Sequence, residues 1–449
     1  MPEWMRRHKL LLIVGAMFVG LLVFAACNGD DDDDVDGVTP TDGETPAAAA
    51  AVEALAAICF PESCRTALRE AIEQGLIDQF IFVDGSKSQD MFDDIGVENF
   101  EGMSGTAPGA ADPDLAQAFE DAYNASEFGP IPALPFLRES YDAVYLIALA
   151  AAAANSTDSA DIRDNLRYIA NPGGTVINPS TAGFTTALEL LEAGEDIDYE
   201  GAAGPQDFDD NGDVAKGAIE IWKIVDGEIT VQSSTVSDLG TASEGTLSRA
   251  DTTPTDPLKI GILVPFTGDL SDFGPAFFDA AKLAAQEINA AGGVFGQDIV
   301  LVDADTGTIE ATGVESANTL IDVEGVSAIV GAASSGVTLP IAESVTGPAG
   351  ILMISPSSTS PALTSVTDND FLFRSTISDA AQGVVLAELA IELGFTSVCT
   401  FFVNTAYGEG LSDQFKETFE ALGGTVPAAV PHEQEQTSYV SELQTCVEG

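Results

Sequence analysis

The chain contains 449 residues, of which 72 are acidic and 16 are basic, and its formal net charge is -56. A surface this acidic repels nucleic acids and other polyanions, which excludes partners of that kind, and it suits a secreted protein. Hydrophobic residues form 45% of the sequence, so we expect a large core and chain enough for roughly two to three domains.

The first segment has the features of a secretory signal. Three basic residues precede an apolar run at 10–26, and Cys27 follows directly, before an acidic stretch at 30–34. A basic head, a short apolar core and small residues before a cut site are typical of a signal peptide rather than a membrane span. Cys27 after two alanines resembles a bacterial lipobox, which implies that residues 1–27 are a lipoprotein signal whose cysteine becomes lipidated. The alternative is an uncleaved anchor helix, and both place the body of the protein outside the cytoplasm, tied to a membrane.

The residues of common catalytic and cofactor sites are missing. Only His8, in the signal, and His432 are available for a catalytic triad or a zinc site. No G-x-x-x-x-G-K motif occurs, no G-x-G-x-x-G motif follows a strand, and no pair of carboxylates stands out. The acidic run at 207–213 has the spacing of a calcium loop, but Ala218 occupies the position of the bidentate glutamate. We therefore expect no catalysis, no cofactor and no metal, and an ordinary turn at 207–213.

After an acidic and alanine-rich tether at 28–51, strands and helices alternate along the chain. The expected strands are 55–60, 79–84, 259–266, 298–305, 327–332, 351–356 and 397–404, and the clearest helices are 64–75, 113–125, 139–154 and 275–293. Asp226-Gly227 predicts the turn of an antiparallel hairpin, and a linker rich in Ser, Thr, Gly and Asp covers 236–256. Continuous apolar strands that alternate with helices predict an α/β fold with parallel sheets covered on both faces.

Short segments on both sides of this linker resemble one protein family. After the linker they are "KIGILVPFTG", "EINAAGGVFG", "IVGAASSGVTLPIAE", "ILMISPSSTSPALT", "DAAQG" and "NTAYGEGL", and before it "FPESCRTALREAIEQGL", "FIFVDGSKSQDMF" and "FDDNGDVAKGAIEIWKIVDG". They are similar to the first and second halves, respectively, of the branched-chain amino-acid-type substrate-binding lipoproteins of ABC transporters. The resemblance covers nearly everything after residue 51, but the second half comes first. It therefore implies a circularly permuted chain, and the alternatives are a remnant of two tandem binding proteins or a misassembled fragment.

The resemblance implies the type I periplasmic binding protein fold, in which two Rossmann-like lobes with parallel sheets are joined by a three-segment hinge. One lobe is expected to combine residues 52–99, 206–235 and 377–449. The other is expected to combine residues 100–205 and 257–376. The linker at 236–256 would then join the family-type C-terminus to the family-type N-terminus.

Of the 5 cysteines, four follow Cys27. An even number in an oxidising compartment favours disulfides, with three possible pairings. The lobes implied by the resemblance place all four in one lobe, which favours the local pairs Cys59–Cys64 and Cys399–Cys446.

Hydroxyl-bearing residues follow two of the expected strands. Ser335 comes after the strand at 327–332, and Ser357 and Thr359 come after the strand at 351–356. Hydroxyls and free amides at a helix start attract carboxylates. By resemblance, these three residues would bind the α-carboxylate and neighbouring polar groups of a ligand. The alternative is that they only cap helices or line turns.

An acidic residue and three aromatic residues complete the expected site. Asp84 ends the strand at 79–84 and matches the family's acidic ligand for an α-ammonium group, where it would make a charge-assisted hydrogen bond in a closed cleft. The alternative for Asp84 is an ordinary Asp-Gly turn. Phe60, Phe273 and Tyr407 match positions that wall the family's pocket, and their alternative is a place in the core.

The resemblance implies a lipid-anchored extracytoplasmic binding protein that captures a small zwitterionic solute, a branched-chain or related amino acid, in a cleft between the lobes. Its partners would be this solute, the permease of an ABC importer and a membrane reached through the lipid anchor. Three alternatives remain open: a binder of amides or urea, a ligand-sensing module for a membrane receptor, and a non-functional gene remnant.

Overall fold

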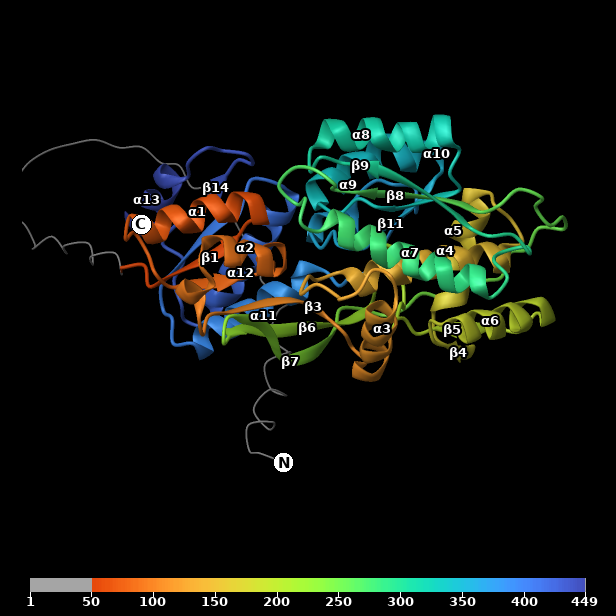
Figure 1. Cartoon of the computed structure of the whole chain (residues 1–449), viewed down its shortest axis with the longest axis horizontal. Helices are drawn as coiled ribbons and strands as arrows, with labels where there is room; N and C mark the ends of the chain where they lie inside the picture. Colours follow the sequence, from red (N-terminus) through yellow and green to blue (C-terminus); the bar gives the residue numbers. More distant parts are fainter. Residues whose placement is uncertain (1–50, 449) are drawn as a thin grey trace, which may run out of the picture. The chain divides into compact units, whose positions relative to one another are not determined.

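The computed structural model describes residues 51–448 (Figure 1). The secretory signal, the lipidation of Cys27 and the tether up to residue 50 lie outside the described residues. Among the helices of residues 51–448, none is both long and apolar enough to cross a membrane.

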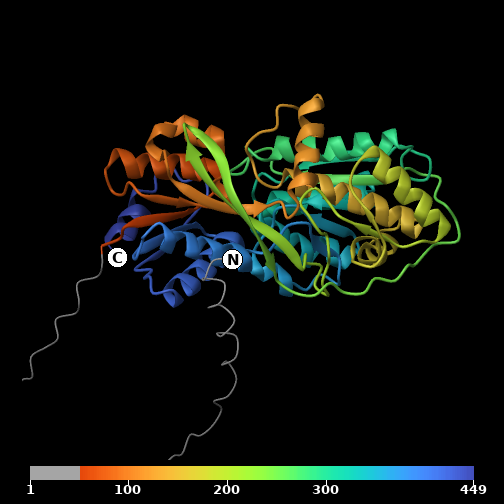
Figure 2. The ribbon, with the colours of Figure 1, turned by 90° about the horizontal axis from the view of Figure 1, so that it is seen from below.

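The larger sheet has seven strands, and it draws on residues from before and after the linker. Its strand order is β14 (Ala429–His432), β13 (Val398–Val403), β1 (Ala54–Ile58), β2 (Phe80–Phe82), β3 (Ser104–Gly109), β6 (Lys216–Val225) and β7 (Glu228–Asp238). The first five strands are parallel, whereas β6 and β7 form an antiparallel hairpin at the edge, visible in Figure 2. The turn of this hairpin is at Asp226-Gly227, where both residues have positive φ as a tight hairpin turn requires.

The second sheet has five strands, all parallel and all from after the linker. Its order is β12 (Leu372–Arg374), β11 (Leu352–Ser355), β10 (Ala328–Gly331), β8 (Lys259–Val264) and β9 (Val300–Asp305). A short parallel pair, β4 (Thr175–Ile177) with β5 (Ile197–Tyr199), lies apart from it. The central strands are buried along their whole length, which explains their uninterrupted apolar sequence.

Helices cover both faces of each large sheet. The helices associated with the seven-stranded sheet are α1 (Pro61–Glu73), α2 (Gln89–Ile95), α11 (Asp379–Glu392), α12 (Ala406–Ala421) and α13 (Val440–Glu448). The remaining helices are α3 (Pro113–Ala125), α4 (Leu137–Ala154), α5 (Ser159–Ala170), α6 (Thr181–Ala193), α7 (Gly274–Ala290), α8 (Glu310–Thr319), α9 (Ser335–Ile341) and α10 (Gly347–Ala349). Alternate residues of β1 enter different cores: Leu55 packs in the cluster that contains α1, and Ile58 in the cluster that contains α12. The period of two along a strand produces this division.

The stretches before and after the linker fold together. Strand β1 lies between β13 and β2, with Leu55 opposite Cys399 on one side and Phe80 on the other. Helix α4, from before the linker, packs against α7, β10 and β11 from after it (Figure 1). Residues 51–448 accordingly lie within one compact unit.

The chain passes between the elements of the two large sheets at four places, residues 110–112, 200–215, 239–258 and 375–378. Strand β3 pairs with β2 and β6, so residues 104–109 lie with the seven-stranded sheet. The first passage therefore follows Gly109, later than the expected boundary after residue 99, because backbone pairing holds β3 between its two neighbours.

Much of the linker lies against α5 and is tied down by asparagine side chains. Asn165 donates to Ser248 O at 2.7 Å and accepts from Ser248 N at 3.0 Å. Asn155 donates to Ala250 O at 3.0 Å, and Asn171 bonds to Ser243 O. An amide side chain can satisfy both a donor and an acceptor of a passing backbone, so this segment is held along the surface rather than loose.

Two disulfides are present, Cys59–Cys64 and Cys399–Cys446. They join the two pairs that the family resemblance favours. The first connects the end of β1 to α1, and the second connects β13 to the last described helix, α13.

Candidate functional site

A small cavity lies where the carboxyl ends of strands from both sheets meet. It has a volume of about 20 Å³ and is lined by Phe60, Asp84, Gly85, Phe136, Leu270, Phe273, Ala333, Ser334, Ser335, Ser357 and Tyr407. Ligands of open α/β sheets bind at this end of the strands. Of the residues expected from the sequence, Ser335, Ser357, Asp84, Phe273, Tyr407 and Phe60 therefore lie together, whereas Thr359 does not line the cavity.

Asp84 is the acidic group of the cavity. Its side chain is 2% exposed and its Oδ1 accepts from Gln382 Nε2 at 2.7 Å and from Tyr407 OH at 2.9 Å. Burial raises the pKa of Asp84 to about 6, against the lowering effect of these two donors. No ion pair joins Asp84 to a basic side chain within residues 51–448, so its charge is left for a cationic group to compensate.

The opposite wall carries serine hydroxyls. Ser335 Oγ accepts from Ser360 N at 3.2 Å, which leaves its own proton free to donate. Ser357 Oγ donates to Ala333 O at 3.0 Å, so its proton is already used. The buried hydroxyl of Ser334 has no partner among the described residues. Ser335 and Ser334 are therefore the side chains that can donate to a ligand oxygen.

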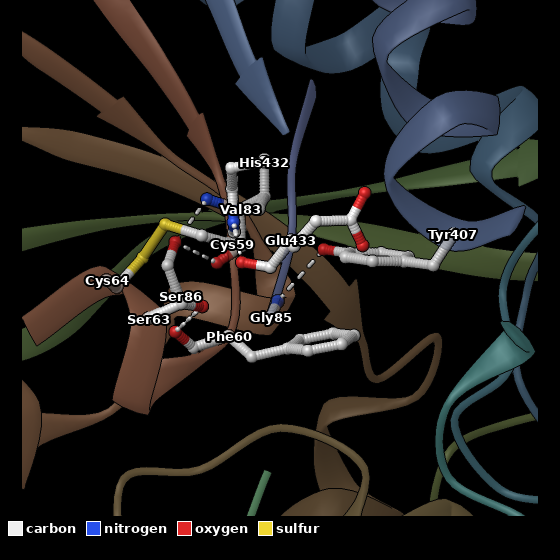
Figure 3. The surroundings of a disulfide bond; sticks show 10 residues. All are labelled: Cys59, Phe60, Ser63, Cys64, Val83, Gly85, Ser86, Tyr407, His432 and Glu433. Atoms are coloured by element: carbon white, nitrogen blue, oxygen red, sulfur yellow. Dashed lines mark hydrogen bonds between the residues drawn. A yellow bond between two sulfur atoms is a disulfide. The ribbon is translucent and has the colours of Figure 1, made fainter. Parts of the chain in front are cut away.

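The aromatic wall is built around a disulfide. The ring of Phe60 stacks on Tyr407 with centroids 5.4 Å apart and planes at 14° (Figure 3). Gly85 N donates to the Tyr407 hydroxyl at 3.1 Å, which fixes the far edge of the ring. The Cys59–Cys64 disulfide closes the short loop that carries Phe60 and begins α1. It therefore limits the positions that Phe60 can take.

Two residues of α11 hold the site together and were missed by the sequence analysis. Asp379 Oδ2 accepts from Thr359 Oγ1 at 2.9 Å, and the Asp379 N–H donates to Thr359 O at 2.8 Å. Gln382, three residues later on the same helix face, is the donor to Asp84. Burial and then the charge of Asp84 raise the pKa of Asp379 well above its usual range. A polar pair three residues apart, just after the strand β12, is the sequence signal that could have identified them.

The acidic run at 207–213 forms a turn, as expected. Asp209 Oδ1 accepts from the backbone of Asn211 at 2.7 Å and of Asp213 at 3.1 Å. Asp213 in turn accepts from Arg374 Nε at 2.6 Å, which ties the turn to β12. Residues 51–448 contain no group of three or more His, Cys, Asp or Glu side chains that could hold a metal ion.

Comparison with known families finds matches on both sides of the linker. The model of the family described as "Periplasmic binding protein" matches residues 257–447. The model described as "Receptor family ligand binding region" matches residues 47–227. Together the two matches cover nearly all of the described chain except the linker.

The similar curated proteins are named as amino-acid-binding proteins. The Leu/Ile/Val-binding protein homolog 3 of Brucella melitensis is 30% identical over 192 residues, which is 42% of this chain and 51% of that protein. The Leu/Ile/Val-binding protein BraC3 of Rhizobium johnstonii is 33% identical over 199 residues, 44% of this chain and 52% of that protein.

A solved structure that resembles the chain is that of the branched-chain amino acid transporter substrate-binding protein LivJ of Streptococcus pneumoniae in complex with isoleucine. It is 31% identical, and the match covers 41% of this chain and 52% of that one with a TM-score of 0.37, too low for the superposition to carry weight.

The chain spans about half the length of the curated relatives it matches. The matched family consists of solute-binding proteins and not of enzymes. With family models matched on both sides of the linker and two helix-covered parallel sheets that meet at one cavity, the chain has the type I periplasmic binding protein fold.

Proposed function

We propose that the protein captures a small zwitterionic amino acid, branched-chain or closely related, in the cavity between the two sheets. The observation that carries the proposal is Asp84: a buried carboxyl with two uncharged donors and no ion pair within residues 51–448, which faces a cavity. The ammonium group of an amino acid supplies the missing positive charge in a poorly hydrated place, where a charge-assisted hydrogen bond is strong.

The other groups of the cavity suit the rest of such a ligand. The hydroxyls of Ser335 and Ser334 are donors for the carboxylate. Phe60, Phe136, Leu270 and Phe273 present apolar surface for the side chain. A cavity of about 20 Å³ is smaller than any amino acid, so the ligand enters when the two walls separate and is enclosed when they return. Thr359 does not contact the ligand in this arrangement, and it acts on the site through its hydrogen bond to Asp379.

The names of relatives support the same class of ligand. Two curated relatives are named as Leu/Ile/Val-binding proteins. We infer that this chain works outside the cytoplasm and delivers its ligand to the permease of an ABC importer. Lipidation of Cys27 would keep it at the membrane, and loss of palmitate labelling in a Cys27→Ser variant tests this.

We further infer that the chain is a circular permutant. The position of β1 between β13 and β2 supports this, since strands from the two ends of the described chain are neighbours in one sheet. The contact between α1 and α13 supports it as well. A loop near these ends is a place where cutting a chain costs no buried hydrogen bond.

A thermal-shift screen of the twenty amino acids, with simple amides and urea as a second set, tests the ligand class. Leucine, isoleucine or valine should raise the melting temperature in a concentration-dependent way, because a ligand that binds only the folded state stabilises it. A rise with amides or urea alone would replace the amino acid by a neutral ligand. No rise with any compound would contradict the proposal.

A further inference from the structure

A second cavity lies beside the places where the chain passes between the two sheets. Its lining residues are Pro108, Gly109, Glu139, Ala203, Pro205, Gln206, Val214, Lys216, Gly217, Ala218, Ser375, Thr376 and Ile377. Its volume is about 10 Å³, which is the space of about one water molecule or one small ion.

Three buried oxygen atoms of this lining have no partner among the described residues: Glu139 Oε2, Gln206 Oε1 and Thr376 Oγ1. The three residues are only 1%, 1% and 2% exposed, respectively. Each comes from a different part of the chain, namely the first turn of α4, the passage at 200–215 and the passage at 375–378. Buried polar atoms are almost always satisfied, so three orphan oxygens that line one cavity point to an occupant.

Of the three residues with unpartnered oxygens, Glu139 decides which occupant fits the cavity, because its carboxyl can carry a charge. Burial, with smaller contributions from the charges of Asp142 and Glu220, raises its pKa to about 7 against the lowering effect of Arg138. Those neighbours have partners of their own: Glu220 pairs with Lys87 at 2.6 Å, and Asp142 accepts from Tyr199 at 2.8 Å. The nearest acid to Arg138 in an ion pair is Glu120, at 3.8 Å.

Lys216 also lines the cavity, but it does not fill the role of a counter-ion. The side chain is exposed, and its charge acts on Glu200 and Asp207 instead. No ion pair of Lys216 with Glu139 is formed within residues 51–448. Glu139 forms no ion pair within residues 51–448, and the charge of Arg138 offsets only part of the cost of ionising a buried carboxyl, which is several kcal/mol in a protein interior.

We propose that this cavity binds a monovalent cation of the size of sodium, with Glu139, Gln206 and Thr376 as its side-chain ligands. One carboxylate balances one positive charge, and the remaining ligands are neutral oxygens, as a hard cation prefers. Calcium takes six to eight oxygens and usually several carboxylates, which this small cavity does not offer. A water molecule would satisfy the hydrogen bonds but would leave the charge uncompensated.

The ligands come from two of the passages between the sheets and from α4. A bound cation therefore ties these segments to each other and stabilises the folded chain in proportion to its occupancy.

The test compares sodium chloride with choline chloride at equal ionic strength, because choline is too large for the cavity. At about pH 8 we expect a saturable rise in melting temperature with sodium and none with choline. Glu139→Gln should abolish the sodium response, and Thr376→Val, which keeps the charge, should weaken it. Glu392→Gln, at an exposed position of α11, is the matched control and should keep it.

Equal melting temperatures in sodium and choline for the unaltered chain would overturn the proposal and leave a water molecule as the occupant. A sodium response that survives both Glu139→Gln and Thr376→Val would overturn it too. If Glu139→Gln fails to fold, the sodium titration of Thr376→Val decides alone: an unchanged half-saturating concentration contradicts the site, and a higher one supports it.

Discussion

Gln382 Nε2 donates a 2.7 Å hydrogen bond to Asp84 Oδ1, although 298 residues separate them in the sequence. One turn earlier on α11, Asp379 bonds to Thr359, which follows β11 of the other sheet. The start of α11 thus contacts Asp84, which lines the candidate site, and Thr359, which follows a strand of the other sheet. Its two side chains position the acidic group and link it to the opposite strand ends.

The charge of Asp84 should be needed for affinity and not for stability. Asp84→Asn keeps an oxygen for Gln382 and Tyr407 but removes the charge, so it should weaken the binding of leucine or isoleucine by about 2–5 kcal/mol. The melting temperature near neutral pH should not fall. The folded-state pKa of about 6 lies above the usual 3.8, so the ionised carboxyl of Asp84 destabilises the folded protein near neutral pH. Asp78→Asn, at an exposed position before β2, should change neither quantity. Unchanged affinity in Asp84→Asn would remove this residue from the site.

Ligand affinity should fall in acid. The pKa of Asp84 is about 6, and an ammonium group binds only the ionised form. The dissociation constant should therefore be constant at about pH 7–8 and rise roughly tenfold per pH unit well below pH 6. Isothermal titration with isoleucine at several pH values measures this dissociation constant. A flat profile down to about pH 4.5 would show that Asp84 is not the group that pairs with the ligand.

Gln382 should tune this pH dependence. Gln382→Met removes the donor that favours ionised Asp84, so the pKa of Asp84 should rise and the midpoint of the pH profile should move up by about one to two units, as expected for a hydrogen bond to a charged group worth about 1.5–3 kcal/mol. A purely structural role would instead weaken binding equally at every pH. Gln117→Met, at an exposed position of α3, is the control and should leave the profile unchanged.

The two disulfides should differ in what they stabilise. Cys399–Cys446 spans 47 residues, so its replacement by two serines should lower the free energy of unfolding by about 4 kcal/mol, against about 2 kcal/mol for Cys59–Cys64, which spans 5. Only the loss of Cys59–Cys64 should also weaken ligand binding, because that loop carries Phe60. Denaturant melts and titrations of the two double variants provide the comparison. Equal losses of affinity would contradict the role given to the loop.

Much of the fold could be predicted because the strands are continuous apolar runs. The strand expected at 55–60 ends at Ile58, since Pro61 opens a helix and the chain leaves the sheet to reach it. The first boundary between lobes was less predictable. Strand β3 contains two glycines and a proline, and only its pairing with β2 and β6 assigns it to the seven-stranded sheet.

The site was predictable where a residue follows its own strand directly, as Asp84 and Ser335 do. The role of Gln382 was not predictable, because it depends on a contact with Asp84, which lies 298 residues away in the sequence. The attachment of the linker was not predictable either, because its Ser and Gly residues indicate a flexible segment. Its backbone is held by Asn155 and Asn165, which lie far from it in the sequence.

The central claim is that both stretches of the chain build one site, in an order that can be reversed without loss. A reordered chain, in which residues 257–449 precede residues 51–238, tests it by isothermal titration with isoleucine beside the natural order. We expect one ligand per chain and the same dissociation constant for both orders, since every group that lines the cavity is present in each. Binding by neither chain, or by only one of them, would contradict the account.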